Sequence, residues 1–195
     1  AIQVARNLGA DVSVEGTEVT IKGIAAQYGS LTQSELHVGE SGLLTRMMIP
    51  VMAQLGSGPV TFTGEKTLLN RPLTGAKEIM ETFGAQIDSI QVPLTVTGPL
   101  KTGRAEISGK HGSQLISGLL MALPFADKNS QLIVKDPKSI PYMFITLEVL
   151  KKFGIKIAND MQGGREFLES GGDWSLCTEM IFKVKGGQRY KAADI

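Results

Sequence analysis

Three segments of the sequence share one pattern, in which a helical stretch ends at a glycine and two short strands follow. The glycines, Gly9, Gly84 and Gly154, follow one another at intervals of 75 and 70 residues. Glycine readily adopts the left-handed conformation with which many helices end. The runs that follow are DVSVEG with EVTIKG, QIDSI with PLTVTG, and KIAND with MIFKVKG, and they alternate as strands do. Repetition over such intervals predicts a fold assembled from copies of one unit.

Two of the three segments are preceded by a further strand, helix and strand. In the second unit these are LHV, a predicted helix over 42–55 and PVTFTG. In the third unit they are RAEISG, a predicted helix over 113–125 and QLIVKD. A complete unit therefore reads β-α-β-α-β-β, and the first unit lacks its opening half. A generic α/β domain with chance spacing would not align three such series.

These units predict the fold class and the domain organisation. We expect an α/β (α+β) fold in which three repeated units, about 1–35, 36–101 and 102–190, pack as a single domain over residues 1–195. The helical segments 43–53 and 117–123 are apolar over much of their circumference, so these helices are expected inside. Residues 160–180 are glycine-rich and polar, which predicts a surface loop or a widened hairpin.

Composition argues against several classes of partner. The 20 Lys and Arg residues nearly balance the 19 Asp and Glu residues, so the net charge of +1 indicates no nucleic acid and no anionic membrane as partner. No apolar run approaches the roughly 20 residues needed to cross a bilayer. The single cysteine, Cys177, can form no intramolecular disulfide, so we expect a reducing, cytoplasmic setting. Because no histidine lies near it in the sequence, we do not expect Cys177 to be a thiol nucleophile. No metal and no cofactor are expected.

Four polar clusters stand just before or at predicted helix starts. They are Gly39–Gly42 followed by Arg46, Asn70–Pro72, Gly109–Gln114, and Ser139–Tyr142. Free backbone N–H groups and the positive end of the helix dipole make such positions natural anion sites. If the repeat brings these helix starts to one edge of the domain, they form a shared pocket for anionic ligands.

Each cluster also has an ordinary structural interpretation. Ser113 and Ser139 stand where helix N-caps commonly stand. Arg71 before a proline is equally consistent with a solvated surface arginine, and His111 with a polar loop residue. The order and spacing of the four clusters together favour the functional interpretation.

The ordered series SGLLTRM, NRPL, GSQLISGLLMALP and SIPYMFITLEVLKKFGI resembles the 5-enolpyruvylshikimate-3-phosphate (EPSP) synthase family. That family carries N-x-G-T-x-x-R, an R-P loop, S-S-Q at the start of an apolar helix, and S-x-P-Y-x-x-x-T. The resemblance covers residues 1 to about 158 and resumes at 185–188. It implies an enolpyruvyl transferase-like enzyme of two domains, each made of three β-α-β-α-β-β units. This chain would be the shikimate-3-phosphate-binding domain, and the second domain would be absent from it.

The resemblance also implies an activity, that of a transferase of the shikimate pathway, which leads through chorismate to the aromatic amino acids. Such an enzyme moves the enolpyruvyl group of phosphoenolpyruvate to the 5-hydroxyl of shikimate 3-phosphate and releases phosphate. The family's K-S-x-x-N-R segment would precede residue 1, and its proton-transfer groups would follow residue 195. The chain opens without Met, as if within a helix. We therefore assign no catalytic residue with certainty and expect the chain alone to be inactive.

For shikimate 3-phosphate, the resemblance implies four binding residues, Ser113, Gln114, Ser139 and Tyr142. The two serines would hold the phosphate, and Gln114 would reach both substrates. Tyr142 would line the pocket for the shikimate ring.

For phosphoenolpyruvate, the resemblance implies that Gly42, Arg71 and again Gln114 are the binding residues. An arginine fork can hold a carboxylate or a phosphate through two parallel hydrogen bonds, which is suited to this substrate.

The sequence departs from the family pattern at several of these positions. Glu40 stands where the family usually has Asn and places a carboxylate near a predicted anion site. Leu43 and Leu44 replace small or hydroxyl-bearing residues, and Gly112 replaces the first serine of S-S-Q. The phosphoenolpyruvate site therefore matches the family less closely than the shikimate 3-phosphate site does.

Two other classes of protein would show the same predicted repeat. One is that of the related UDP-N-acetylglucosamine enolpyruvyl transferases, whose reactive cysteine loop has no counterpart here, because Cys177 lies far from the R-P motif. The other is a non-catalytic binding module, which the departures at Glu40 and Gly112 would favour. The S-x-P-Y motif also favours the shikimate enzyme over the UDP-N-acetylglucosamine enzymes.

Overall fold

The computed structural model describes residues 1–24 and 31–195, and residues 25–30 of the first predicted unit lie outside the described residues. The described part of the first unit forms α1 (Ile2–Asn7), β1 (Asp11–Glu15) and β2 (Glu18–Lys22). The second unit forms β3 (Glu35–His37), α2 (Gly42–Leu55), β4 (Val60–Thr63), η1 (Lys66–Asn70), α3 (Ala76–Thr82), β5 (Gln86–Ile87) and β6 (Leu94–Thr97). The third unit forms β7 (Gly103–Ser108), α4 (Gln114–Ala122), η2 (Leu123–Phe125), β8 (Ser130–Lys135), α5 (Ile140–Lys152), β9 (Ile157–Gly163), α6 (Arg165–Glu169), η3 (Trp174–Leu176) and β10 (Cys177–Val184).

The second and third units have the same sheet topology. One sheet has the strand order β3-β4-β6-β5 and the other β7-β8-β10-β9. In both sheets the first two strands are parallel and the other neighbours are antiparallel. A parallel pair needs a crossover connection, which α2 and α4 supply. The predicted β-α-β-α-β-β unit is therefore confirmed, and β1 pairs with β2 as the closing hairpin of the first unit.

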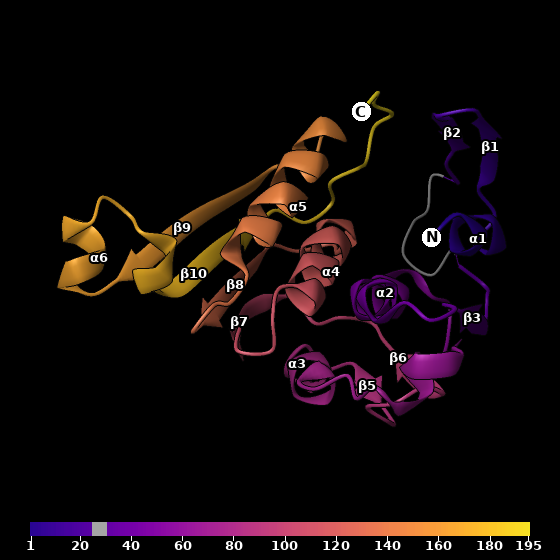
Figure 1. The fold of residues 1–195 in the computed structure, drawn as a ribbon, viewed down its shortest axis with the longest axis horizontal. Coiled ribbons are helices and arrows are strands. Elements are labelled where there is room, and N and C mark those ends of the chain that lie inside the picture. The colour runs from indigo at the N-terminus through magenta and orange to yellow at the C-terminus, as the bar shows by residue number, and fades with distance from the viewer. Residues whose placement is uncertain (25–30) are drawn as a thin grey trace.

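The first helices of the two complete units, α2 and α4, pack against each other in the interior (Figure 1). Their inward position is confirmed by the burial of Ile49, Met52 and Leu119. Gly118 allows the two backbones to approach closely, because a Cβ atom at this position would lie only 2.4 Å from the carbonyl oxygen of Met47. The apolar surfaces of both helices are thus buried where the helices pack against each other.

The second helices of the units pack against strands or against the inner helices. α1 contacts β3 and α3 contacts β7, so each of these helices touches the first strand of the following unit. α5 packs on α4, where the hydroxyl oxygens of Ser117 and Thr146 lie 2.7 Å apart. Buried apolar side chains from all three units belong to one hydrophobic cluster.

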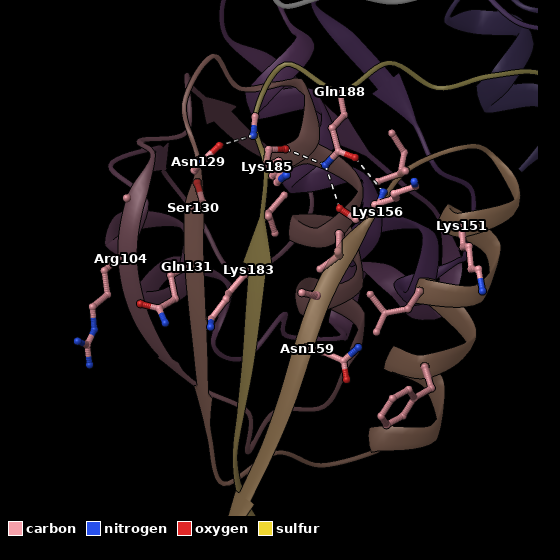
Figure 2. Close-up of a pocket in the computed structure, with 18 of the residues that line it drawn as sticks. Arg104, Asn129, Ser130, Gln131, Lys151, Lys156, Asn159, Lys183, Lys185 and Gln188 are labelled. Carbon is pink, nitrogen blue, oxygen red and sulfur yellow. Dashed lines mark hydrogen bonds between the residues drawn. The ribbon is translucent and has the colours of Figure 1, made fainter.

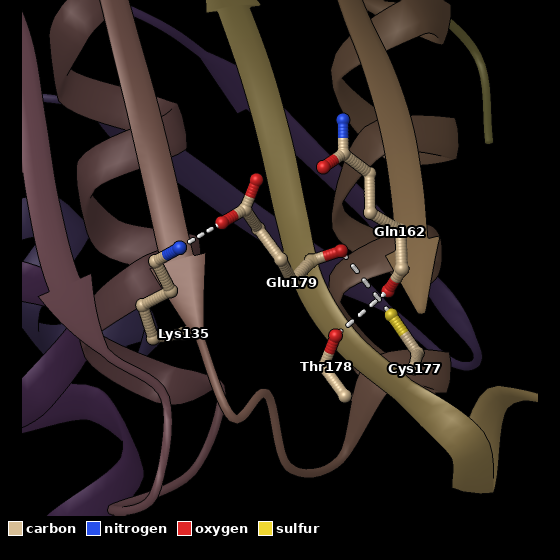
Figure 3. Close-up of polar contacts among 5 residues, drawn as sticks. All are labelled: Lys135, Gln162, Cys177, Thr178 and Glu179. Atoms are coloured by element: carbon tan, nitrogen blue, oxygen red, sulfur yellow. Dashed lines mark hydrogen bonds and ion pairs between the residues drawn. The ribbon is translucent and has the colours of Figure 1, made fainter. Parts of the chain in front are cut away.

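The predicted loop at 160–180 is a widened hairpin in the structure. β9 and β10 pair as antiparallel strands, so of the two predicted alternatives the widened hairpin is confirmed. Cross-strand hydrogen bonds, rather than the polarity of the local sequence, determine that this segment forms paired strands. The Thr178 hydroxyl donates to the Gln162 carbonyl at 3.4 Å (Figure 3). On the other side of β10, Glu179 pairs with Lys135 of β8.

Candidate functional site

The parallel strand pairs place several helix starts at the same edge of the sheets. In the third unit Ser108 at the end of β7 lies opposite Lys135 at the end of β8. The loops that follow lead directly into α4 and α5. In the second unit His37 at the end of β3 lies opposite Thr63 at the end of β4, and α2 follows β3. The carboxyl ends of neighbouring parallel strands are where α/β folds commonly bind ligands.

The loops before α4 and α5 contact each other through their backbones. The Gly109 N–H donates to the Lys135 carbonyl at 2.7 Å, and the Lys138 N–H donates to the Gly109 carbonyl at 3.3 Å. A Cβ atom at Gly109 would lie 2.7 Å from the Cα of Pro137, so only glycine allows this approach. The loops that carry Ser113 and Ser139 are therefore neighbours.

Ser113 and Ser139 do not behave as ordinary N-caps. Within the part of the chain that the structure describes, neither side chain makes a capping hydrogen bond to its own helix. Ser139 has φ 58° and ψ 39°, a left-handed conformation that is uncommon outside glycine and often marks functional sites. Ser113 is only 5% exposed. By contrast, Ser41 caps α2 by accepting the Leu44 N–H at 3.1 Å.

The two other residues predicted to bind shikimate 3-phosphate lie on the first turns of these helices. Gln114 is the first residue of α4, immediately after Ser113. Tyr142 lies on α5 with 64% of its surface exposed, and its N–H donates to the Ser139 carbonyl at 3.1 Å. An exposed phenol at a helix start is available to a ligand. These residues therefore surround the junction of the two loops.

Near the predicted phosphoenolpyruvate-binding residues, two arginines, Arg46 and Arg71, lie beside Gly42 in the first turn of α2. A Cβ atom at Gly42 would lie 2.9 Å from Nη1 of Arg46 and 3.3 Å from Nη1 of Arg71. Arg46 donates to the Gly42 carbonyl at 3.1 Å and to the Pro72 carbonyl at 3.0 Å. Burial, and then the neighbouring Arg71 charge, lower the pKa of Arg46. Two guanidinium groups held this close favour an anion beside them.

Glu40, the acidic departure from the family pattern, has a partner in η1. Its carboxylate accepts a hydrogen bond from the Thr67 hydroxyl. This hydrogen bond is the main cause that lowers the pKa of Glu40, and the nearby charges of Lys66 and Arg71 lower it further. Glu40 is therefore ionised at neutral pH and offsets part of the positive charge at this end of α2.

His111 links the two halves of the predicted site. A Cβ atom at Gly75, just before α3, would lie 2.6 Å from Cδ2 of His111. The loop that carries His111 thus contacts the start of α3 on one side and the start of α5 on the other. The structure places Gly42 beside Arg71, and it places the loop before Ser113 beside the loop before Ser139. It joins these two groups through His111 and Gly75.

Two cavities lie beside the sheet of the third unit. The larger, of about 1180 Å³, lies between α5 and the ends of β8, β9 and β10, and Figure 2 shows its lysine-rich lining. None of the predicted site residues lines it. The second, of about 940 Å³, is lined by Ser139 and by residues of α6 and η3, including Trp174. The part of the cavity wall formed by α6 and η3 was not predicted from the sequence, where its one signal is the single Trp in a polar stretch.

Across residues 1–24 and 31–195, no group of three or more His, Cys, Asp or Glu side chains is placed to hold a metal ion. Among the helices of the same residues, none has the length and apolar character that crossing a membrane requires.

Cys177 begins β10 and its side chain is buried. Its thiol donates to the Glu179 carbonyl at 3.3 Å (Figure 3). Burial raises the pKa of the Cys177 thiol above its ordinary value, so the thiolate is scarce at neutral pH. These surroundings are those of a structural thiol.

We expect iodoacetamide at pH 7.5 to modify Cys177 at least roughly tenfold more slowly in the native chain than in urea, because the thiol is buried and protonated. Mass spectrometry of timed samples measures both rates. The native rate should still rise as the pH passes the usual cysteine range, since the pKa is raised. Equal rates in the two states would contradict the structural role.

The repeated units, with their inner helices and aligned helix starts, define an α/β domain of the enolpyruvyl transferase type. The family model for EPSP synthase (3-phosphoshikimate 1-carboxyvinyltransferase) matches residues 1–175, and the chain belongs to this family. Its relatives include the 3-phosphoshikimate 1-carboxyvinyltransferases of Clostridium kluyveri, 32% identical over 97% of this chain, and of Klebsiella pneumoniae, 30% identical over 84%. The chain spans about 40% of the length of each.

A solved structure supports the same fold. EPSP synthase from Acinetobacter baumannii is similar with a TM-score of 0.71 at 22% identity. The similarity covers 98% of this chain and 39% of that one. The predicted fold class is therefore confirmed.

Proposed function

We propose that this chain is the shikimate-3-phosphate-binding domain of an EPSP synthase. The whole protein would transfer the enolpyruvyl group of phosphoenolpyruvate to the 5-hydroxyl of shikimate 3-phosphate and release phosphate. The observation that carries this proposal is the pair of adjoining helix starts whose serine hydroxyls do not cap their helices. Family membership selects the reaction.

The shikimate 3-phosphate side accounts for the unusual loops before α4 and α5. Ser113 and Ser139 offer hydroxyl donors at helix N-termini, where the dipole favours a phosphate. Gln114 and Tyr142 stand on the adjoining first turns and would contact the substrates and the ring. The positive φ of Ser139 is a conformational cost that ligand binding would explain.

The phosphoenolpyruvate side is assigned to Gly42, Arg71 and Gln114. Arg71 lies beside Gly42, where the missing side chain leaves room for the guanidinium groups of Arg46 and Arg71. Arg46 is assigned to positioning, because its guanidinium already donates to two carbonyl groups. The proton transfers are assigned to groups of a second domain of the same protein, and a cytoplasmic setting is proposed with it.

The relatives favour this function over that of the UDP-N-acetylglucosamine enzymes. The relatives from Clostridium kluyveri and Klebsiella pneumoniae are both 3-phosphoshikimate 1-carboxyvinyltransferases. The buried, protonated Cys177 also offers no reactive thiol of the kind that the second enzyme class uses.

Calorimetric titration of the chain with shikimate 3-phosphate tests the proposal. We expect binding by the wild type, and we expect Ser113→Ala and Ser139→Ala each to weaken it about tenfold to a hundredfold. Each variant loses one hydrogen bond to a charged group, which contributes about 1.5–3 kcal/mol. Ser41→Ala is the matched control, because this serine caps its helix, and it should lower stability without changing this affinity.

Two results would count against the proposal. The first is a wild-type chain that does not bind shikimate 3-phosphate at millimolar concentration. The second is binding that both serine variants retain in full, which would mean that the two serines have only a structural role at the starts of their helices.

A further inference from the structure

The tip of the β9–β10 hairpin, Gly164–Leu176, is a folded element with its own internal contacts. Phe167 of α6 is buried, and the Ser170 hydroxyl donates to its carbonyl at 2.8 Å. Asp173 donates its N–H to the Ser170 hydroxyl at 2.9 Å. The Asp173 carboxylate accepts the N–H of Ser175 at 2.9 Å, which caps η3. The hairpin tip therefore has a defined surface.

The hairpin tip packs against α5 close to the candidate site. The ring of Trp174 stacks on Phe144, with 5.3 Å between the centroids and 17° between the planes. Phe144 follows Ser139 by five residues, which is roughly 7 Å along a helix axis. At the base of the tip, the Asp136 N–H donates to the Thr178 carbonyl at 2.9 Å. The tip thus contacts both the loop before α5 and the first turns of α5.

The cavity of about 940 Å³ lies between these two surfaces. Lys138, Ser139 and Pro141 line it from the side of α5, whereas Arg165 and Trp174 line it from the hairpin tip. Its volume is within the range of small-molecule sites. The serine that the proposed function assigns to phosphate binding therefore borders a cavity whose opposite wall is the hairpin tip.

The lining groups suit an anionic, hydroxylated ring. The charged residues that line the cavity are two cations, Lys138 and Arg165, and two carboxylates, Asp136 and Glu166. Asp136 already pairs with Lys110 at 3.4 Å. Arg165 binds Glu169 at 2.6 Å, but both side chains are exposed, and such a pair exchanges partners at little cost. Trp174, 43% exposed, offers an aromatic surface to the apolar face of a ring.

We propose that the hairpin tip forms one wall of the shikimate 3-phosphate site and that Trp174 is a positioning residue that acts on Ser139 through Phe144 and α5. This inference rests on the proposed function and extends it to a segment outside the four motif clusters. The stacked rings hold the first turns of α5, and with them the hydroxyl of Ser139, toward the ligand.

Two aromatic pairs of the chain allow a matched experiment. Trp174→Leu removes the stack beside Ser139, whereas Phe125→Leu removes the stack of Phe125 on Tyr190, whose centroids are 5.0 Å apart, beyond the far end of α4. Calorimetric titration with shikimate 3-phosphate should show about two- to tenfold weaker binding for Trp174→Leu. Trp174→Phe should restore the wild-type affinity, and Phe125→Leu should leave it unchanged.

Trp174 is also the single tryptophan of the chain, so its emission reports on this wall alone. Shikimate 3-phosphate should change the emission of the wild type, and Ser139→Ala should require a higher ligand concentration for the same change. Wild-type binding with equal affinity in Trp174→Leu, or with no change in emission, would overturn this inference and leave the proposed function intact. No binding by the wild type would overturn both.

Discussion

Gly118→Val should destabilise the chain by about 3 kcal/mol, because the new side chain would enter the contact between α2 and α4. A Cβ atom there lies 2.4 Å from the Met47 carbonyl oxygen and 3.0 Å from Cγ of Pro50. Backbone atoms cannot rotate away as a side chain can, so the two inner helices must separate. For a chain of this size the melting temperature should fall by about 6–12 °C, which differential scanning calorimetry measures.

Gly58→Val is the control for this substitution. A Cβ atom at Gly58 meets no other atom within 4 Å among the described residues. The same side chain should therefore change the stability by only about 0.5 kcal/mol. Equal effects at the two positions would show that α2 and α4 do not pack as closely as described.

Arg46→Ala should lower the free energy of unfolding by about 2–3 kcal/mol, because it removes a charged donor from two backbone carbonyl groups. The guanidinium joins the first turn of α2, at Gly42, to Pro72 in the loop before α3. Arg46 is half-buried, and its hydrogen bond to the Gly42 carbonyl is partly shielded from water. Urea denaturation followed by circular dichroism measures the loss.

Arg46→Lys separates geometry from charge in this bridge. A lysine ammonium keeps the positive charge but lacks the planar fork that reaches both carbonyl groups. We expect it to recover less than half of the stability that Arg46→Ala loses. Full recovery by lysine would mean that charge alone, and not the double hydrogen bond, stabilises this junction.

The order of elements was predictable because its signals are local. A glycine that ends a helix and an alternating run after it depend on a few neighbouring residues, and both complete units have the predicted strands and helices. The small helices of the hairpin tip were not predictable in this way. The five residues of α6 are polar except Phe167 and Leu168, and Phe167 is buried only because the folded hairpin surrounds it.

The candidate site shows the same division between local and tertiary causes. Motif order selected Gly42, Ser113 and Ser139, each of which stands at the start of a helix that the sequence also predicts. The helix start predicted at Pro72 was wrong, because Arg71 follows the last residue of η1 and α3 begins only at Ala76. Nothing in the motifs indicates that Trp174 contacts α5, since the two segments meet only after β9 and β10 have paired.

By itself the sequence determined the repeat, the unit topology and which helices lie inside, since glycine punctuation and apolar periodicity act over short ranges. Only the tertiary structure decided what each serine before a helix does. Ser41 has an extended backbone and caps α2, whereas Ser139 is left-handed and its side chain makes no capping hydrogen bond to α5. The contact of Gly109 with Pro137 joins the loop before α4 to the loop that ends at Ser139. Such a contact between distant residues is a property of the packed domain, which no local pattern encodes.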